Sequence, residues 1–89
     1  MTPASPTIVF TEGILRVTVY DLAPGEGLPE HEHGPEATHI TIVATGAVTV
    51  NGVNLPAGKC IAFGVDEPHE IVGEASPTSR IFNIVTGTG

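Results

Sequence analysis

Four histidines are the side chains of this 89-residue chain best suited to act together at one site. His31, His33 and His39 lie within nine residues of one another, and His69 follows thirty residues later. Neutral imidazole nitrogen binds Fe, Ni, Cu and Zn better than Mg or Ca, which prefer oxygen ligands. An HxH pair alone is a weak metal signal, because a single histidine is more often a surface residue or a hydrogen-bonded core residue. The two further histidines strengthen the interpretation of a metal site.

Strand geometry would let these histidines converge. Residues i and i+2 of a strand point to the same face, so His31 and His33 share a face and Glu32 points away. His39 and His69 each open a further apolar stretch. Two histidines on one strand and a third at the start of the next can meet at one point. The arrival of His69 beside the other three depends on the fold, because spacing alone does not bring it there.

The stretch that His39 opens has the strongest strand pattern in the chain. One face of that strand carries His39, Thr41 and Val43. The other face carries Ile40 and Ile42. Apolar residues on both faces are typical of a strand that packs on a second sheet or on a partner.

Composition favours an all-β protein. Val, Ile and Thr total 29 of the 89 residues and Leu only 4, and branching at Cβ suits a pleated sheet better than a helix. Gly and Pro total 19 and are spread along the chain, which leaves no window with helical apolar spacing. About nine short strands separated by turns predict a sandwich or a barrel. Asn51-Gly52 predicts a two-residue hairpin, because both turn positions need positive φ.

Glycines around the histidines make the sequence resemble the cupin family. The first cupin motif is a glycine, five residues, HxH, three or four residues, a glutamate, six residues and a glycine. Here the same order is Gly25, five residues, His31-Glu32-His33, five residues, His39, six residues, Gly46. The second motif is a glycine, five residues, a proline, one residue, a glycine, two residues, a histidine, three residues and an asparagine. Here it is Gly58, five residues, Gly64, Val65, Asp66, two residues, His69, three residues, Gly73, so that the match spans residues 25–73.

The match departs from the family pattern at several positions. His39 stands where the family usually has glutamate, and it comes one residue later than usual. Gly64, Asp66 and Gly73 replace the proline, glycine and asparagine of the second motif, whose metal-binding histidine is kept as His69. Cupins with histidine at the glutamate position are a known variant, so the resemblance implies a site of four histidines.

The resemblance implies an all-β fold, a small antiparallel cupin (jelly-roll) barrel. It also implies one divalent transition metal, Fe, Mn, Ni, Cu or Zn, held by His31, His33, His39 and His69. Four neutral imidazoles leave the ion its full +2 charge, whereas a site with one glutamate would carry +1. A six-coordinate ion would keep two positions for water, O₂ or substrate, whereas zinc in a closed tetrahedron would be structural.

Other polar residues are candidates for supporting roles. A ligating histidine normally donates its second N–H to a carboxylate or a carbonyl. The glutamates adjacent in sequence are Glu30, Glu36, Glu67 and Glu70. For any one of them, a solvated loop charge is the commoner case. Arg16 could anchor a substrate carboxylate if its face lines the barrel, although an outward polar face or an oligomer contact is the commoner alternative.

The chain is long enough for one domain only. Residues 1–7 are expected to form a flexible N-terminal arm, and residues 8–89 a single cupin domain. So short a chain often needs a metal, a disulfide or a partner subunit, and Cys60, as the only cysteine, excludes an internal disulfide. A homodimer is therefore expected, with the edge strand at Ile8–Phe10 as the candidate for pairing across it.

The charge of the chain excludes nucleic acid as a partner. Three Lys and Arg against ten Asp and Glu give a formal net charge of −7, and three scattered cations cannot form a basic patch. Membrane insertion is not expected, because no apolar run approaches the roughly 18 residues of a span. The first seven residues lack the basic and apolar regions of a signal peptide, so a cytoplasmic location is expected.

Three functions fit these residues. The first is a metal-dependent oxidoreductase, dioxygenase-like, that acts on a small molecule. In it the metal would carry the chemistry, because no general acid or base can be assigned. The second is a non-catalytic cupin that binds a small ligand or a metal for sensing or storage. The third is a structural metal site in an interaction module. Cupins include enzymes and non-enzymes, and a fold does not fix a function.

Overall fold

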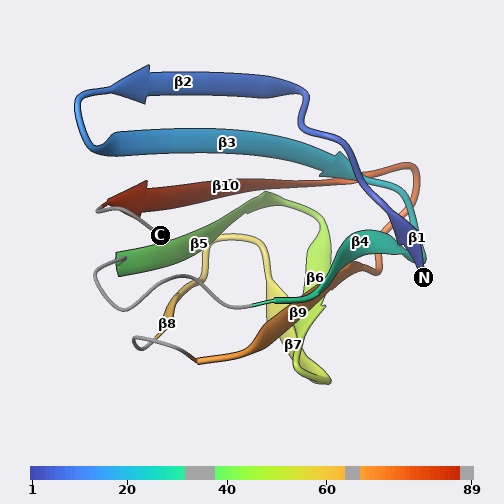
Figure 1. Ribbon diagram of the computed structural model, residues 1–89. Coiled ribbons are helices and arrows are strands. Elements are labelled where there is room, and N and C mark those ends of the chain that lie inside the picture. The colour runs from blue at the N-terminus through green and yellow to red at the C-terminus, as the bar shows by residue number, and fades with distance from the viewer. Residues whose placement is uncertain (32–37, 64–66, 87–89) are drawn as a thin grey trace.

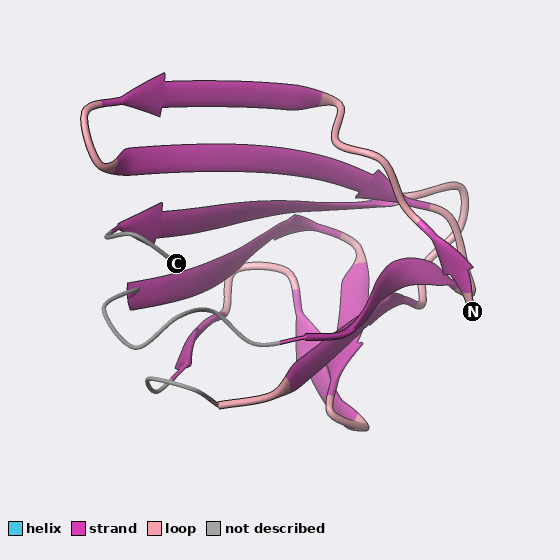
Figure 2. Ribbon diagram, viewed as in Figure 1, coloured by secondary structure: helices cyan, strands magenta, loops and turns pink. Residues whose placement is uncertain are grey.

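The fold is that of a computed structural model, which describes residues 1–31, 38–63 and 67–86, with the backbone only at residues 30 and 31. These residues form ten strands in two five-stranded sheets, and no helix (Figure 1, Figure 2). The prediction of an all-β fold with about nine strands is thus confirmed. In this part of the chain no helix is long and apolar enough to cross a membrane.

The strands of the two sheets are interleaved along the chain. The strands are β1 Thr2–Pro3, β2 Ile8–Glu12, β3 Leu15–Leu22, β4 Glu26–His31, β5 Thr38–Thr45, β6 Ala47–Val50, β7 Val53–Pro56, β8 Cys60–Phe63, β9 His69–Gly73 and β10 Ser79–Thr86. The first sheet has the order β1-β4-β9-β6-β7, and the second has the order β2-β3-β10-β5-β8. From β3 to β10 the chain passes between the sheets at every connection except the β6–β7 hairpin, which is jelly-roll winding. β2 is an edge strand of the second sheet and lies at the top of the molecule in Figure 1. β7 is an edge strand of the first sheet and lies at the bottom.

The core lies between the sheets and takes alternate residues from each strand. Along β10 every second residue is buried, beginning with Ser79. The buried apolar cluster consists of Leu28, Val48, Val50 and Ile71 from the first sheet and Leu22, Val43, Phe63 and Ile81 from the second. We call the face of the second sheet that meets this core its inner face, and the reverse side its outer face.

The predicted faces of β5 and the predicted hairpin are confirmed. His39 and Thr41 are buried on the inner face of β5, whereas Ile40 and Ile42 are half-buried on the outer face. At the β6–β7 turn, Asn51-Gly52 takes φ values of 49° and 82°, as a two-residue hairpin requires.

The N-terminal residues contain β1, which pairs in parallel with β4. The backbone N–H of Ala4 continues this contact by donating to the carbonyl of Gly27 at 2.8 Å. This pairing attaches β1 to the edge of the first sheet. The division into an arm over residues 1–7 and a domain over residues 8–89 stays a prediction.

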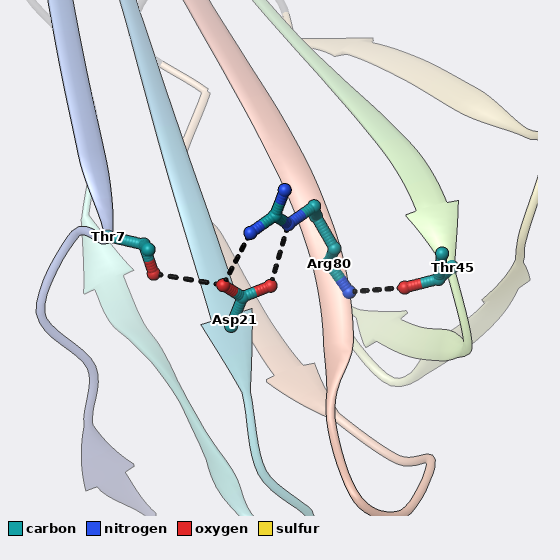
Figure 3. Close-up of polar contacts among 4 residues, drawn as sticks. All are labelled: Thr7, Asp21, Thr45 and Arg80. Carbon is teal, nitrogen blue, oxygen red and sulfur yellow. Dashed lines mark hydrogen bonds and ion pairs between the residues drawn. The ribbon is translucent and has the colours of Figure 1, made fainter.

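An ion pair joins β3 and β10 on the outer face (Figure 3). Arg80 Nε and Nη2 donate to the two carboxylate oxygens of Asp21 at 2.8 and 2.9 Å. The Thr7 hydroxyl donates to the same carboxylate at 3.1 Å, and the Arg80 backbone N–H donates to the Thr45 hydroxyl, also at 3.1 Å. The hydrogen bonds from Arg80 hold the pKa of Asp21 below its usual value, with a smaller contribution from Thr7.

Replacing Asp21 with asparagine is expected to lower the unfolding temperature at neutral pH and to change it little in acid. Because the pKa of Asp21 is lowered in the folded chain, its contribution is fully present above the unfolded pKa of about 3.9. That contribution is lost as the pH falls through the lower, folded value. Thermal unfolding of both proteins from about pH 7 to about pH 2 checks this. A difference that persists unchanged in acid would contradict it.

Candidate metal centre

Two of the four predicted ligands meet in the core. His39 lies in β5 of the second sheet and His69 begins β9 of the first, so their side chains come from facing sheets. Their exposed fractions are only 2% and 1%. His39 Nδ1 lies 3.1 Å from His69 Nε2. The winding of the chain between the sheets thus produces the convergence of these two residues that their spacing left open.

The ring nitrogens turned away from this contact have polar partners. His69 Nδ1 lies 3.0 Å from the backbone carbonyl oxygen of Glu67, which can only accept, so Nδ1 carries a proton. His39 Nε2 lies 3.2 Å from the Thr41 hydroxyl, which donates its one proton to Asn83 Oδ1 at 2.7 Å. His39 Nε2 is therefore the donor to Thr41. These contacts set the tautomer and the orientation of both rings.

With both rings neutral, the nitrogens that face one another carry lone pairs. The proton of His69 is on Nδ1 and that of His39 is on Nε2, so the two nitrogens 3.1 Å apart are both acceptors. Two lone pairs at this distance repel unless a cation lies between them. A shared proton or a metal ion held by both nitrogens would supply that cation.

This donor set fits a divalent transition metal. Two nitrogens that bind one ion at about 2.0–2.1 Å lie roughly 2.8–3.4 Å apart, for ligand angles from a right angle to the tetrahedral value. The observed 3.1 Å between His39 and His69 falls in that range. A ligand histidine whose second N–H donates to a carbonyl, as His69 does to Glu67, is also the usual arrangement around a bound metal.

Phe63 packs against both imidazoles. Its ring stacks on His69 with centroids 4.0 Å apart and planes 19° apart, and its centroid lies 4.9 Å from that of His39. Phe63 reaches this position because it pairs directly with His39 across β5 and β8. The phenyl ring restrains both imidazoles against rotation, which keeps their nitrogens directed at one another.

The other two predicted ligands are placed only in part. His31 ends β4, and its backbone pairs with His69 in the β4–β9 ladder. Opposed residues in such a ladder have Cα atoms about 4.5–5.5 Å apart, so the backbone of His31 lies beside the site. His33 lies outside the described residues. Among the side chains that the structure describes, no three His, Cys, Asp or Glu residues form a metal-binding group. The set of four ligands stays a prediction.

Of the four candidate glutamates, only Glu67 and Glu70 are described with their side chains, and neither contacts His39 or His69 through its carboxylate. Glu67 takes part through its backbone carbonyl oxygen. Glu70 has its backbone N–H bound to Asn51 Oδ1 at 2.8 Å. Of the other two candidates, Glu36 lies outside the described residues, and only the backbone of Glu30 is described.

The Thr41–Asn83 pair was not expected at the site. The strand pattern puts Thr41 on the same face as His39 but indicates no role for it. Asn83 is the buried polar residue of β10 that pairs directly with Thr41 across the sheet. An asparagine that alternates with Ile81 and Val85 on one face of the strand is the signal that could have identified it, since buried polar side chains need partners.

Arg16 lies on the inner face of the second sheet, in register with the site. It shares that face of β3 with Tyr20 and Leu22, and it pairs with Val85, which pairs in turn with His39. Two strand spacings, about 10 Å, separate the Cα atoms of Arg16 and His39. Burial raises the pKa of the Tyr20 hydroxyl, and the positive charge of Arg16 opposes this shift. The Arg16 side chain is exposed at this inner-face position, and its role in anchoring a carboxylate stays a prediction.

Comparison with known proteins identifies the fold. No protein-family model and no curated protein matches the sequence. A Klebsiella pneumoniae protein with a double-stranded β-helix domain superposes with a TM-score of 0.81 at 20% identity, over 94% of this chain and 76% of that one. For an RmlC-like cupin from Desulfovibrio desulfuricans the TM-score is 0.71 at 18% identity, over 88% and 77% of the two chains.

A third similar structure is the complex of Rhodobacter sphaeroides SigE with the anti-sigma ChrR. One of its chains matches with a TM-score of 0.74 at 21% identity, over 90% of this chain and 43% of that one. These likenesses agree with the architecture of two facing sheets and with the histidine and glycine pattern of the sequence. The chain therefore has the double-stranded β-helix fold of the cupins.

Proposed function

We propose that this protein is a small metal-binding cupin in which His31, His33, His39 and His69 hold one divalent transition metal. The observation that carries the proposal is the 3.1 Å approach of His39 Nδ1 to His69 Nε2 in a buried core. The pairing of the His31 backbone with His69 supports the proposal, because it places the backbone of a third histidine beside the pair. Nitrogen ligands suit Fe, Ni, Cu and Zn, and Mn is the remaining candidate.

The metal is proposed to act on a small molecule, with a dioxygenase-like oxidoreductase as the first candidate class. When bound, the ion would supply Lewis-acid or redox chemistry. The chain's own residues would bind and orient. Phe63 shields the imidazoles from water, and Thr41 holds His39 in its tautomer. Arg16, on the same face about 10 Å from His39, would attract the anionic group of a ligand. A cytoplasmic location accompanies this proposal and stays a prediction.

A non-catalytic sensing cupin is the second candidate. The observation in its favour is the similarity to a chain of the SigE complex with the anti-sigma ChrR, a setting in which such a fold takes part in a protein assembly. In that case the metal or ligand would change the surface that a protein partner contacts. A purely structural metal in an interaction module is a variant of this candidate.

Metal analysis of the protein purified without a histidine tag tests the proposal. We expect near-stoichiometric Fe, Mn, Ni, Cu or Zn by mass spectrometry, and its loss in the double variant His31→Ala/His33→Ala. Circular dichroism during chelation then separates the roles. A chain that keeps its fold without metal has a functional site, whereas one that unfolds has a structural site. If neither form contains metal, and neither takes it up when metals are added back, the proposal is wrong.

Replacing Thr41 with valine is expected to weaken metal binding about 10–100-fold, the usual effect of losing a residue that orients a ligand. Valine keeps the shape of threonine but cannot accept the hydrogen bond from His39 Nε2. Competition with a chromogenic chelator measures the affinity. Thr49→Val is the matched control, because the Thr49 hydroxyl donates to Glu74 at an exposed position of the first sheet. Equal affinities of the Thr41 variant and the parent protein would remove Thr41 from the site.

A further inference from the structure

The outer face of the second sheet carries two unbroken rows of apolar side chains. In the strand order β2-β3-β10-β5-β8, one row is Ile8, Val19, Phe82, Ile42 and Cys60. The other row, in the same order, is Phe10, Val17, Ile84, Ile40 and Ala62. Neighbours in each row are directly paired residues, so both rows cross all five strands. We call these ten residues the outer apolar face.

The first sheet does not cover the outer apolar face. None of its ten residues belongs to the buried cluster between the sheets. Ile8 and Phe10 are 50% and 52% exposed, and Cys60 is exposed as well. Of the residues on the central strands, Val19 is buried at 4% exposed, and the other five, which include Phe82 and Ile84, are only half-buried. Contiguous apolar surface of this kind is rare on a monomer and marks an interaction site.

The size of the outer face suits one partner of a dimer. Five strands about 4.8 Å apart give a width of roughly 24 Å, and strands of four to eight residues give lengths of roughly 13–26 Å, or about 500 Å² in projection. The accessible area of a corrugated surface exceeds its projection, and a standard interface buries about 800 Å² per partner. The two rows would form the apolar centre of such an interface, and the polar strand ends would form its rim.

The distribution of charge favours a second copy of the chain as the occupant. The chain carries a net charge of −7, yet no charged residue lies in either row. At one end of the face, Asp21 and Arg80 neutralise one another through their ion pair (Figure 3). At the other end, Glu12 continues the same side of β2 and is exposed, so it would lie at the rim, and two identical faces can pack at about 10 Å without burying a charge within the rows. A basic partner would find no carboxylate on these rows to recognise.

We propose that two copies of the chain form a two-fold dimer by packing their outer apolar faces against one another. This differs from the edge-to-edge pairing of β2 that the sequence favours, because β2 would contribute the side chains of Ile8 and Phe10 and not its backbone. The dimer does not depend on the proposed metal, since His39 lies on the reverse side of the sheet.

Sedimentation velocity of the full chain tests this dimer. The parent protein is expected to be a dimer at micromolar concentration. Phe10→Glu and Ile84→Glu are each expected to weaken the dimer at least about 100-fold, because each dimer would bury two carboxylates. Val9→Glu and Val53→Glu are matched controls at residues 57% and 69% exposed, and should stay dimeric. Val9 lies on the same strand as Phe10 but on the opposite face, and Val53 lies in the first sheet.

Each outcome decides the question. A parent protein that is monomeric up to about 100 μM overturns the proposal, since specific dimers of this size are usually tighter. A dimer weakened equally by Val9→Glu and Phe10→Glu means edge pairing of β2 and also overturns it. Circular dichroism of every variant confirms the fold, and if Ile84→Glu does not fold, the comparison of Phe10 with Val9 still decides.

Discussion

Replacing His69 with alanine is expected to abolish stoichiometric metal binding, a larger loss than the roughly 10–100-fold caused by changing a residue beside a ligand. The substitution removes one donor nitrogen and the hydrogen bond to the Glu67 carbonyl that aims it. It also leaves His39 Nδ1 without the ring that lies 3.1 Å away. Isothermal titration with Zn²⁺ or Ni²⁺ measures the affinity, and His39→Ala should behave alike.

A control must separate the loss of a metal ligand from the loss of core packing at His69. His69 is 1% exposed and stacks on Phe63, so alanine leaves a cavity and lowers stability as well. His69→Gln keeps most of the volume, and it should lose metal as His69→Ala does while retaining more of the unfolding free energy. A folded His69→Gln protein that still binds metal with the parent affinity would show that His69 is not a ligand.

Replacing Gly27 with alanine is expected to lower the unfolding free energy by about 3 kcal/mol or more. A Cβ at Gly27 would overlap the carbonyl oxygen of Ile71 and lie 2.9 Å from Val72 Cα, and backbone cannot move aside as a flexible side chain can. The strands β4 and β9 would have to separate. Because the same ladder pairs His31 with His69, metal affinity should fall together with stability.

Gly58→Ala is the matched control for this substitution. Gly58 has a φ of 88°, which alanine adopts with a strain of about 1–2 kcal/mol, but nothing lies within 4 Å of the added Cβ. Denaturant unfolding of the two variants should therefore separate a backbone clash from conformational strain. A Gly27 variant as stable as the Gly58 variant would contradict the close approach of β4 and β9.

Much of the fold follows from residues that are near one another in the chain. The alternation of His39, Ile40, Thr41 and Ile42 assigns both faces of β5, because successive side chains of a strand point to opposite sides. Asn51-Gly52 identifies the β6–β7 hairpin for an equally local reason, since those two residues tolerate positive φ. The glycine and histidine spacings identify the cupin fold, which the similar structures confirm.

The site could be predicted only in outline. Histidines are few and chemically distinctive, so His39 and His69 could be chosen without a structure. The polar contacts that orient them could not be derived, because threonine and asparagine are common residues. Thr41 and Asn83 become partners only through the register of β5 against β10, which brings together residues 42 positions apart. The contact of His69 with the backbone carbonyl of Glu67 could not be derived either, because a pattern of side chains does not predict a backbone partner.

By itself the sequence determined that this chain is all-β, which face of β5 points to the core, and which residues are candidate ligands. These properties depend on backbone preferences and on the period of two along a strand, which act over a few residues. Only the tertiary structure decided that His39 and His69 face one another at 3.1 Å and that ten apolar residues align on one open sheet face. Both depend on which strands pair and in which register, and pairing is a non-local balance of burial and backbone hydrogen bonding that no short segment determines.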